Sequence, residues 1–151
     1  MPPQLITFLI AASPIFELRG AIPMALGIYN LSPLNAFFWA VLGNILPVIF
    51  LLWLLEPLSK YLSHHNYFFN RFFAWLFERT RKNHSRQFEV WGGLALVTFV
   101  AIPLPLTGGW SGAVAAFVFD IPFKKALPLI SLGVIIAGII VTLISLSFSV
   151  I

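Results

Sequence analysis

The sequence predicts an all-α integral membrane protein, and three observations support this fold class. Of the 151 residues, 60% are hydrophobic and only 9% are charged, whereas a soluble domain carries about 25% charged residues. Two apolar runs, residues 33–55 and 126–151, contain no charge, and each is long enough to cross a hydrocarbon core, which takes roughly 20 helical residues. Two further runs, residues 4–29 and 92–119, are interrupted by proline and glycine.

The first interrupted run divides into two arms of about ten residues, a length that suits re-entrant segments better than spanning helices. Its interruptions are Pro14, Glu17, Arg19, Gly20 and Pro23. Proline removes a backbone donor, and freed backbone groups at membrane depth need protein or a wet cavity around them. We therefore expect a hairpin that lines a polar site. No Lys or Arg precedes the first arm, so we expect it to be retained rather than cleaved as a signal peptide.

The second interrupted run, broken by "IPLPLTGGWSG", repeats the first at a constant offset of 89. The recurring positions are Pro14, Gly20 and Pro33, then Pro103, Gly109 and Pro122. Broken segments in corresponding places of two halves point to a transporter-type site. We predict one membrane domain with two inverted repeats, residues 1–56 and 92–151. Each repeat would be a re-entrant helical hairpin followed by a transmembrane helix.

The basic residues indicate the topology. The 57–91 segment holds six Lys or Arg residues against two Glu, and Lys124 and Lys125 follow the second hairpin. If both interrupted runs are hairpins, these two loops share one side; if both runs span, the loops face opposite sides. The positive-inside rule favours the hairpins, with residues 57–91 cytoplasmic and both termini outside. The expected location is a plasma (inner) membrane of prokaryotic type.

The connector over residues 57–91 has an amphipathic pattern. Aromatic and apolar residues at helical spacing are Phe68, Phe69, Phe72, Phe73 and Leu76, and the charged face has Arg71, Glu78, Arg81 and Lys82. A basic, aromatic, amphipathic helix is typical of the headgroup plane, which predicts an interfacial helix. An ordinary helix packed under the membrane domain is the alternative.

Glu17 and Arg19 are the ionisable residues of the first hairpin. A charge at the bilayer centre costs about 2.5–3.5 kcal/mol, so the two must pair, line a polar pocket or reach water. Positions i and i+2 do not face each other on a regular helix, so pairing requires irregular backbone. A substrate or proton pathway is the functional interpretation. A structural ion pair that fixes the hairpin tip is the alternative.

The second break supplies complementary groups. Glycines in Thr107–Gly112 let backbone donors approach a ligand, and a half-helix starting near Trp110 would direct its positive end at an anion, with Arg19 as the cation. Close packing between hairpins is the alternative. The predicted substrate- or ion-binding residues are Glu17, Arg19, Gly20, Pro23, Pro103, Pro105, Thr107, Gly108, Gly109, Trp110 and Ser111.

Other features narrow the function. The chain has no cysteine, and no phosphate-binding loop, nucleophile elbow or paired-carboxylate motif is present, so we expect no enzyme, no cofactor and no metal. The net charge of +4 reflects topology rather than nucleic-acid binding. Asn44 is expected to pack between helices. Gly133 and Ala137 give a small-residue face that suggests helix contact and a homodimer.

The motifs "ELRGAIP" and "AIPLPLTGGWSGA" resemble the small multidrug export proteins over essentially the whole chain. That family is distantly similar to the DedA membrane proteins, which are described with two facing re-entrant hairpins and linked to polyprenyl-phosphate lipid translocation. The resemblance thus implies the same hairpin arrangement. DedA proteins carry arginines in the second hairpin, whereas here both ionisable residues lie in the first.

Together these features predict a small secondary transporter or flippase in the lipid bilayer. It would export small amphipathic molecules or translocate a lipid phosphate, with Glu17 as proton or cation carrier and Arg19 as anion ligand or charge balance. A homodimer is expected, since one copy with four membrane blocks can hardly enclose a pathway. The alternative is a non-transporting assembly or structural protein in which Glu17 and Arg19 form a structural ion pair.

Overall fold

The computed structural model describes residues 1–65, 68, 70–72, 74–75, 86–103, 107–119 and 121–149. Its helices are α1 (Pro3–Ala12), α2 (Glu17–Gly27), α3 (Pro33–His65), α5 (Arg86–Ala101), α6 (Gly109–Val118) and α7 (Phe123–Ser149). Within these described residues there is no strand, which confirms the predicted all-α class.

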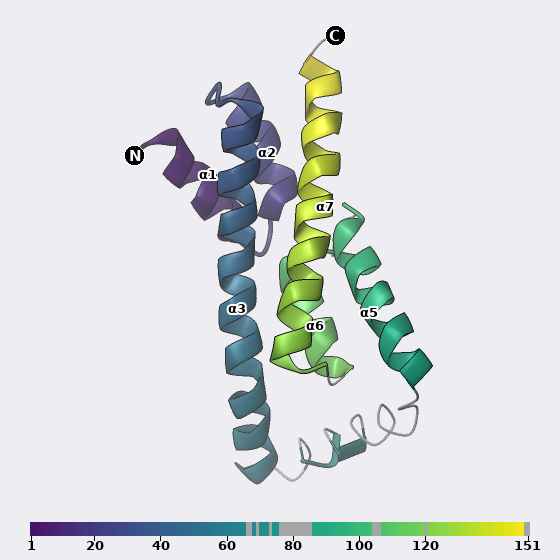
Figure 1. Ribbon diagram of the computed structural model, residues 1–151. Coiled ribbons are helices and arrows are strands. Elements are labelled where there is room, and N and C mark those ends of the chain that lie inside the picture. Colours follow the sequence, from purple (N-terminus) through teal and green to yellow (C-terminus); the bar gives the residue numbers. More distant parts are fainter. Residues whose placement is uncertain are drawn as a thin grey trace.

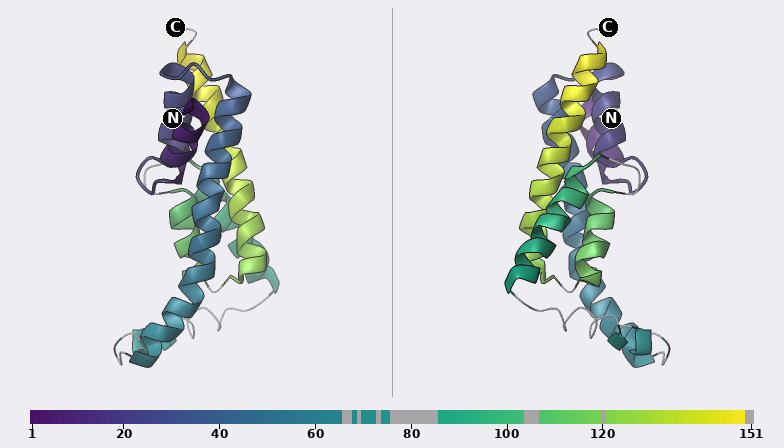
Figure 2. Two further views of the ribbon diagram at one scale, coloured as in Figure 1. Left: turned by 90° about the vertical axis from the view of Figure 1, so that its left-hand side faces the viewer. Right: turned by 90° about the vertical axis from the view of Figure 1, so that its right-hand side faces the viewer.

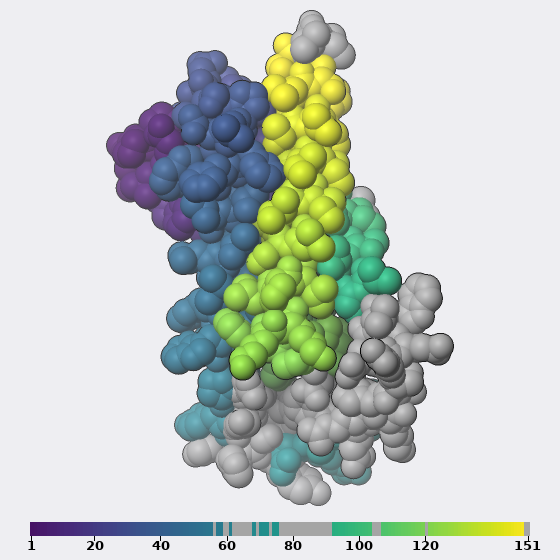
Figure 3. Space-filling model, in the orientation of Figure 1, coloured from purple at the N-terminus to yellow at the C-terminus, as the bar shows by residue number. Residues whose placement is uncertain are grey.

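Two long helices, α3 and α7, form the centre of the fold and lie side by side along much of their length (Figures 1 and 3). The chain reverses direction between α1 and α2, and again between α5 and α6, so each pair of short helices is a hairpin (Figure 1). The first hairpin packs toward one end of the long helices and the second toward the other (Figures 1 and 2). The two turns therefore point toward each other near the middle of the molecule.

Pro33–Leu55 of α3 and Phe123–Ser149 of α7 are long and apolar enough to cross a membrane, as the sequence predicts. Only a third of each apolar stretch is buried inside the protein. The outward-facing side chains are large and apolar: Trp53 is 66% exposed and Phe148 is 72% exposed. An exterior of this kind suits hydrocarbon rather than water, so the fold is that of a membrane protein.

The first hairpin turns at Ser13 because Pro14 follows it. Proline excludes the preceding residue from the helical region, and Ser13 is extended, with φ −73° and ψ 142°. The Ser13 hydroxyl donates to the Ile10 carbonyl at 2.7 Å and accepts from the Phe16 amide at 3.3 Å. Helix α2 then begins at Glu17, whose φ of +49° is left-handed. The predicted interruption is thus a short, internally hydrogen-bonded turn.

The connection from α2 to α3 follows from standard capping chemistry. Asn30 is left-handed, with φ +50°. The Tyr29 amide donates to the Met24 carbonyl at 3.2 Å, as in a helix end closed by a 6→1 bond, and the Leu31 amide donates to the Ala25 carbonyl at 2.9 Å. The Ser32 hydroxyl accepts from the Asn35 amide at 3.4 Å. With Pro33 as the first helical residue, this is the usual start of a helix.

Small residues permit close packing between the long helices and the hairpins. A Cβ added at Gly133 of α7 would lie 2.7 Å from Val100 Cβ of α5, and Ala137 is 6% exposed. The helix contact predicted for this face therefore exists, but its partner is α5 of the same chain. Gly133 itself is thus covered within the chain, and the homodimer stays a prediction.

Some sequence predictions lie outside the described residues. The amphipathic helix predicted within residues 57–91 falls largely in this group, as does Pro105. At the start of that segment α3 continues without a break to His65, so the first residues of the predicted connector extend the long helix.

Candidate functional site

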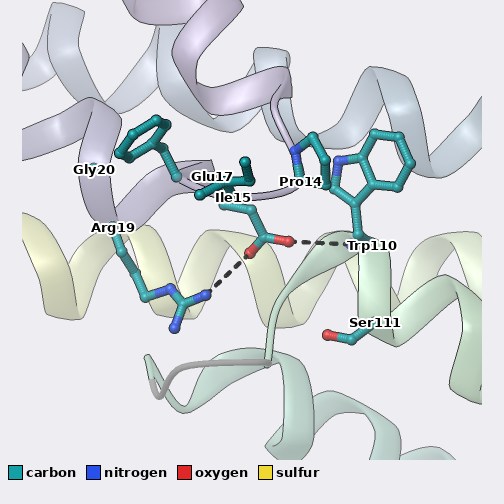
Figure 4. A pocket seen from close by; sticks show the side chains of 8 residues that line it. Pro14, Ile15, Glu17, Arg19, Gly20, Trp110 and Ser111 are labelled. Atoms are coloured by element: carbon teal, nitrogen blue, oxygen red, sulfur yellow. Dashed lines mark hydrogen bonds and ion pairs between the residues drawn. The ribbon is translucent and has the colours of Figure 1, made fainter.

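The turns of the two hairpins meet at the Glu17 carboxylate. Glu17 comes from the first turn of α2, and Trp110 comes from the first turn of α6. In Figure 4 the carboxylate points between Arg19 on one side and the start of α6 on the other. Residues 93 positions apart in sequence are therefore in direct contact.

A backbone N–H donor and a guanidinium group contact the Glu17 carboxylate. The Trp110 backbone N–H donates to Glu17 Oε1 at 3.4 Å, and Arg19 Nη2 lies 3.9 Å from Glu17 Oε2. The Glu17 side chain is 6% exposed and that of Arg19 is 25% exposed. The acid is thus enclosed by protein, while the guanidinium lies at the edge of the site.

Glu17 takes the place of a capping side chain for α6. The first turn of a helix has backbone N–H groups without an intrahelical partner, and a side-chain oxygen at the N-cap usually accepts from the second or third of them. Here the N-cap is Gly108, which has no side chain, and Trp110 is the second residue of the helix. The Glu17 oxygen from the other hairpin fills that role, and the positive end of α6 favours its negative charge.

Gly108 is required for this approach. A Cβ at position 108 would overlap the Glu17 carboxylate, so the backbone of the second turn touches the acid directly. Gly108 also has φ +157° and ψ −165°, a region that is essentially restricted to glycine. Both sterics and backbone conformation therefore explain glycine at this position.

Asn44 of α3 contributes a buried amide to the same place. A Cβ at Gly109 would overlap Asn44 Oδ1, so the amide faces the first residue of α6. Asn44 is 1% exposed, and neither its Oδ1 nor its Nδ2 has a hydrogen-bond partner in the described structure. A cavity of about 10 Å³ lies beside Asn44, Glu17 and Gly108, which is close to the room that one water molecule needs.

Trp110 links the turns a second time. Its indole Nε1 donates to the Ala12 carbonyl at 3.1 Å, and Ala12 is the last residue of α1. The carbonyls of a helix's last turn have no intrahelical partner, so the indole satisfies one of them. Trp110 therefore joins the end of α1 to the start of α6.

Two larger cavities adjoin Arg19. An open cavity of about 620 Å³ is lined by Pro14, Ile15, Phe16, Glu17, Arg19, Gly20, Trp110 and Ser111 (Figure 4). A second, of about 480 Å³, lies between α2 and α7 and has Arg19 and Pro103 in its lining. Its other lining residues are mostly apolar, among them Leu26, Val141 and Phe148. An anionic head and an apolar tail could both be accommodated around Arg19.

The structure brings most of the residues predicted from sequence to one place. Glu17, Arg19, Gly20, Trp110 and Ser111 line the larger cavity. Thr107, Gly108 and Gly109 surround the small one, and the Thr107 hydroxyl donates to the Ile102 carbonyl at 2.6 Å. Pro23 and Pro103 line the cavity between α2 and α7. Their role as a binding site stays a prediction.

Asn44 is the residue whose position in the site the sequence did not predict, since packing was expected for it. The available signal is an amide in the middle of an otherwise apolar span. As for metals, the described residues contain no group of three or more His, Asp or Glu that could hold an ion. Among the described residues the site offers one acid, one guanidinium, one amide and a helix N-terminus, and these groups can bind an ionic ligand.

Residues 17–140 match the family described as "Putative small multi-drug export protein", and the match includes Glu17, Arg19 and the second turn. No curated protein and no solved structure matches the chain. Because the match covers most of the 151 residues, the chain belongs to this family.

Proposed function

We propose that this member of the small multidrug export family is a secondary transporter of the plasma (inner) membrane that moves small amphipathic molecules without altering them covalently. The observation that carries the proposal is the meeting of two hairpin turns at one enclosed carboxylate, Glu17. An ionisable residue at membrane depth is a candidate for a substrate or proton pathway, and discontinuous helices form such sites in transporters.

The proposal places the hairpins in the membrane as re-entrant segments. Helices α1 and α6 have ten residues each, which is too short to cross a bilayer. The end of α1 at Ala12 and the end of α5 at Ala101 are separated by 101 − 12 = 89 residues, the offset found in the sequence. Each half has two short helices followed by a long one, and we propose that the halves are inverted repeats.

Cysteine labelling tests this topology, because the chain has no native cysteine. Single cysteines at Asn30, Asn66 and Asp120 would be treated with a membrane-impermeant maleimide in intact cells and in inverted vesicles. Re-entrant hairpins require positions 66 and 120 to label from the cytoplasmic side and position 30 from outside. Labelling of positions 66 and 120 from opposite sides would contradict the arrangement.

Within this mechanism Glu17 carries the coupling proton or cation and Arg19 balances or binds charge. When Glu17 is ionised, it holds the two turns together through Trp110 of the second hairpin, while Arg19 of its own hairpin balances its charge. When Glu17 is neutralised, its attraction to the positive end of α6 is lost, and the contact between the turns weakens. The state of one carboxylate would thus control whether the two larger cavities communicate.

Transport in proteoliposomes tests the function directly. Purified protein would be reconstituted, and uptake of a lipophilic cation and of a fluorescent short-chain lipid phosphate would be followed with and without a pH gradient. We expect gradient-dependent movement of at least one probe, and its loss in Glu17→Gln. Glu78→Gln, which removes a carboxylate from the segment of residues 57–91, is the matched control.

The competing function is a structural or assembly role in which Glu17 only joins the hairpins. The Glu17–Trp110 contact favours it as well, because that contact links two parts of the fold. Absence of transport for every probe, combined with loss of folded protein in Glu17→Gln, would support this role. A homodimer is part of the transport proposal, and native mass spectrometry of the reconstituted protein measures it.

A further inference from the structure

The groups around the Glu17 carboxylate favour the binding of an anion. These groups are the Arg19 guanidinium, the Trp110 N–H and the positive end of α6. Helix N-termini bind anions readily, and guanidinium groups do so with geometric preference. The carboxylate of the protein itself therefore fills what is chemically an anion site.

Asn44 provides independent evidence for an additional ligand. Its side-chain amide is buried and lacks a partner, and it lies against Gly109 at the start of α6. A buried polar group without a hydrogen bond is costly, so a native protein retains one where a ligand or water completes the site. Asn44 Nδ2 is a donor that a second oxyanion could engage.

The contacts of Glu17 are long for charged partners. The separations of 3.4 Å and 3.9 Å exceed the 2.7–2.9 Å that is typical of charge-assisted N–H···O bonds, by roughly half an ångström or more. Glu17 also has a left-handed backbone, with φ +49°, which is strained for a residue with a side chain. The internal carboxylate is thus held loosely, and a free oxyanion could bind more closely.

The cavity between α2 and α7 has the same guanidinium in its lining. Its volume is about 480 Å³, and Arg19 shares its lining with the apolar side chains of Leu26, Val141, Ile144 and Phe148. Cation and apolar wall together match an anion that carries a hydrocarbon chain. Since the site already accommodates a carboxylate, a carboxylate is the head group that fits best.

We propose that Glu17 is a built-in competitor in an anion site formed by Arg19, Asn44 and the start of α6, and that an amphipathic carboxylate displaces it. This inference rests on the proposed transport function, because it names the substrate class for the same site. It adds a second role for Glu17, which carries the coupling proton or cation in the transport proposal and here competes with the substrate for the anion site.

Equilibrium binding tests the inference without any need for transport. Radiolabelled decanoate would be titrated against the full-length protein in nanodiscs by scintillation proximity, with empty nanodiscs subtracted. The variants are Glu17→Gln, which keeps size but removes charge, and Glu17→Asp, which withdraws the carboxylate by one methylene. Arg19→Gln tests the site, and Lys124→Gln, at an exposed position at the start of α7, is the control for charge removal.

We expect Glu17→Gln to bind decanoate about tenfold more tightly than the wild type, because in the wild type decanoate must displace the hydrogen-bonded Glu17 carboxylate. Glu17→Asp should also bind more tightly, which keeps the test decisive if the glutamine variant does not fold. Arg19→Gln should lose decanoate binding, and so should the double variant that combines Asn44→Leu with Glu17→Gln. Lys124→Gln should bind decanoate as tightly as the wild type.

Three outcomes would overturn the inference. They are equal or weaker decanoate binding by both Glu17 variants, acetate binding as tight as decanoate, or preference for decyltrimethylammonium over decanoate. The first result would exclude Glu17 as a competitor. The second would exclude recognition of the apolar tail, and the third would exclude an anionic substrate class. The binding constants are measured without transport. Failure of the proteoliposome assay would therefore not change them, and the two proposals can fail separately.

Discussion

Substitution of Gly108 by alanine is the sharpest test of the contact between the hairpin turns. The added Cβ would overlap the Glu17 carboxylate, and position 108 has φ +157° and ψ −165°. Backbone strain of this kind costs of order 1–3 kcal/mol, and loss of the charged hydrogen bond costs about 1.5–3 kcal/mol. We therefore expect destabilisation of about 2.5–6 kcal/mol in total.

Reversible unfolding in mixed micelles of sodium dodecyl sulfate, followed by circular dichroism, measures this loss. Gly92→Ala is the matched control, because a Cβ at Gly92 of α5 meets nothing within 4 Å. In a helix interior the same change stabilises by up to about 1 kcal/mol. The two variants should therefore shift the unfolding free energy in opposite directions.

The double variant separates sterics from backbone strain. In a Glu17→Ala background the overlap is absent, so Gly108→Ala should cost only the strain of about 1–3 kcal/mol. Non-additivity between the two positions is expected for residues in contact. Strict additivity, or a Gly108→Ala variant as stable as the wild type, would refute the placement of Glu17 against the second turn.

Three further predictions concern the surroundings of the site. Asn44→Leu should leave the unfolding free energy unchanged or raise it by up to about 2 kcal/mol, because an unpaired buried amide is replaced by an apolar group; the same micelle unfolding measures it. Trp110→Phe should cost about 1 kcal/mol through loss of the bond to the Ala12 carbonyl, with accelerated amide exchange at the end of α1 as its local sign. Gly133→Ala should cost about 1–3 kcal/mol by overpacking against Val100, whereas Gly93→Ala, whose Cβ would lie 3.5 Å from Leu129, should cost little.

Much of the fold is predictable from sequence because local chemistry determines it. Pro14 ends α1 by excluding Ser13 from the helical region, so two arms rather than one rod follow from the sequence. The apolar span predicted over residues 33–55 coincides with the stretch Pro33–Leu55 of α3. Helix α6 begins at Gly109, one residue before the start expected near Trp110.

The contacts within the site are not predictable in this way because they depend on packing. Nothing local to Glu17 indicates that its carboxylate accepts from a backbone N–H 93 residues later. The position of Asn44 depends on which face of α3 meets α6, and an apolar helix has little periodicity to indicate a face. Likewise, the small-residue face at Gly133 indicates close helix contact, but sequence does not tell an internal partner from a second copy.

The location of the site at helix ends follows from the chemistry of the lipid environment. A continuous helix satisfies its own backbone groups, so α3 and α7 offer a ligand only their side chains. The interrupted helices have unsatisfied N–H groups at the start of α6 and carbonyls at the end of α1, and these are the groups that Glu17 and Trp110 engage. One carboxylate therefore satisfies α6 and attracts Arg19 at once. Any event that neutralises or displaces it exposes both groups together, and in the proposed transport mechanism this would couple ionisation of one residue to opening between the hairpin turns.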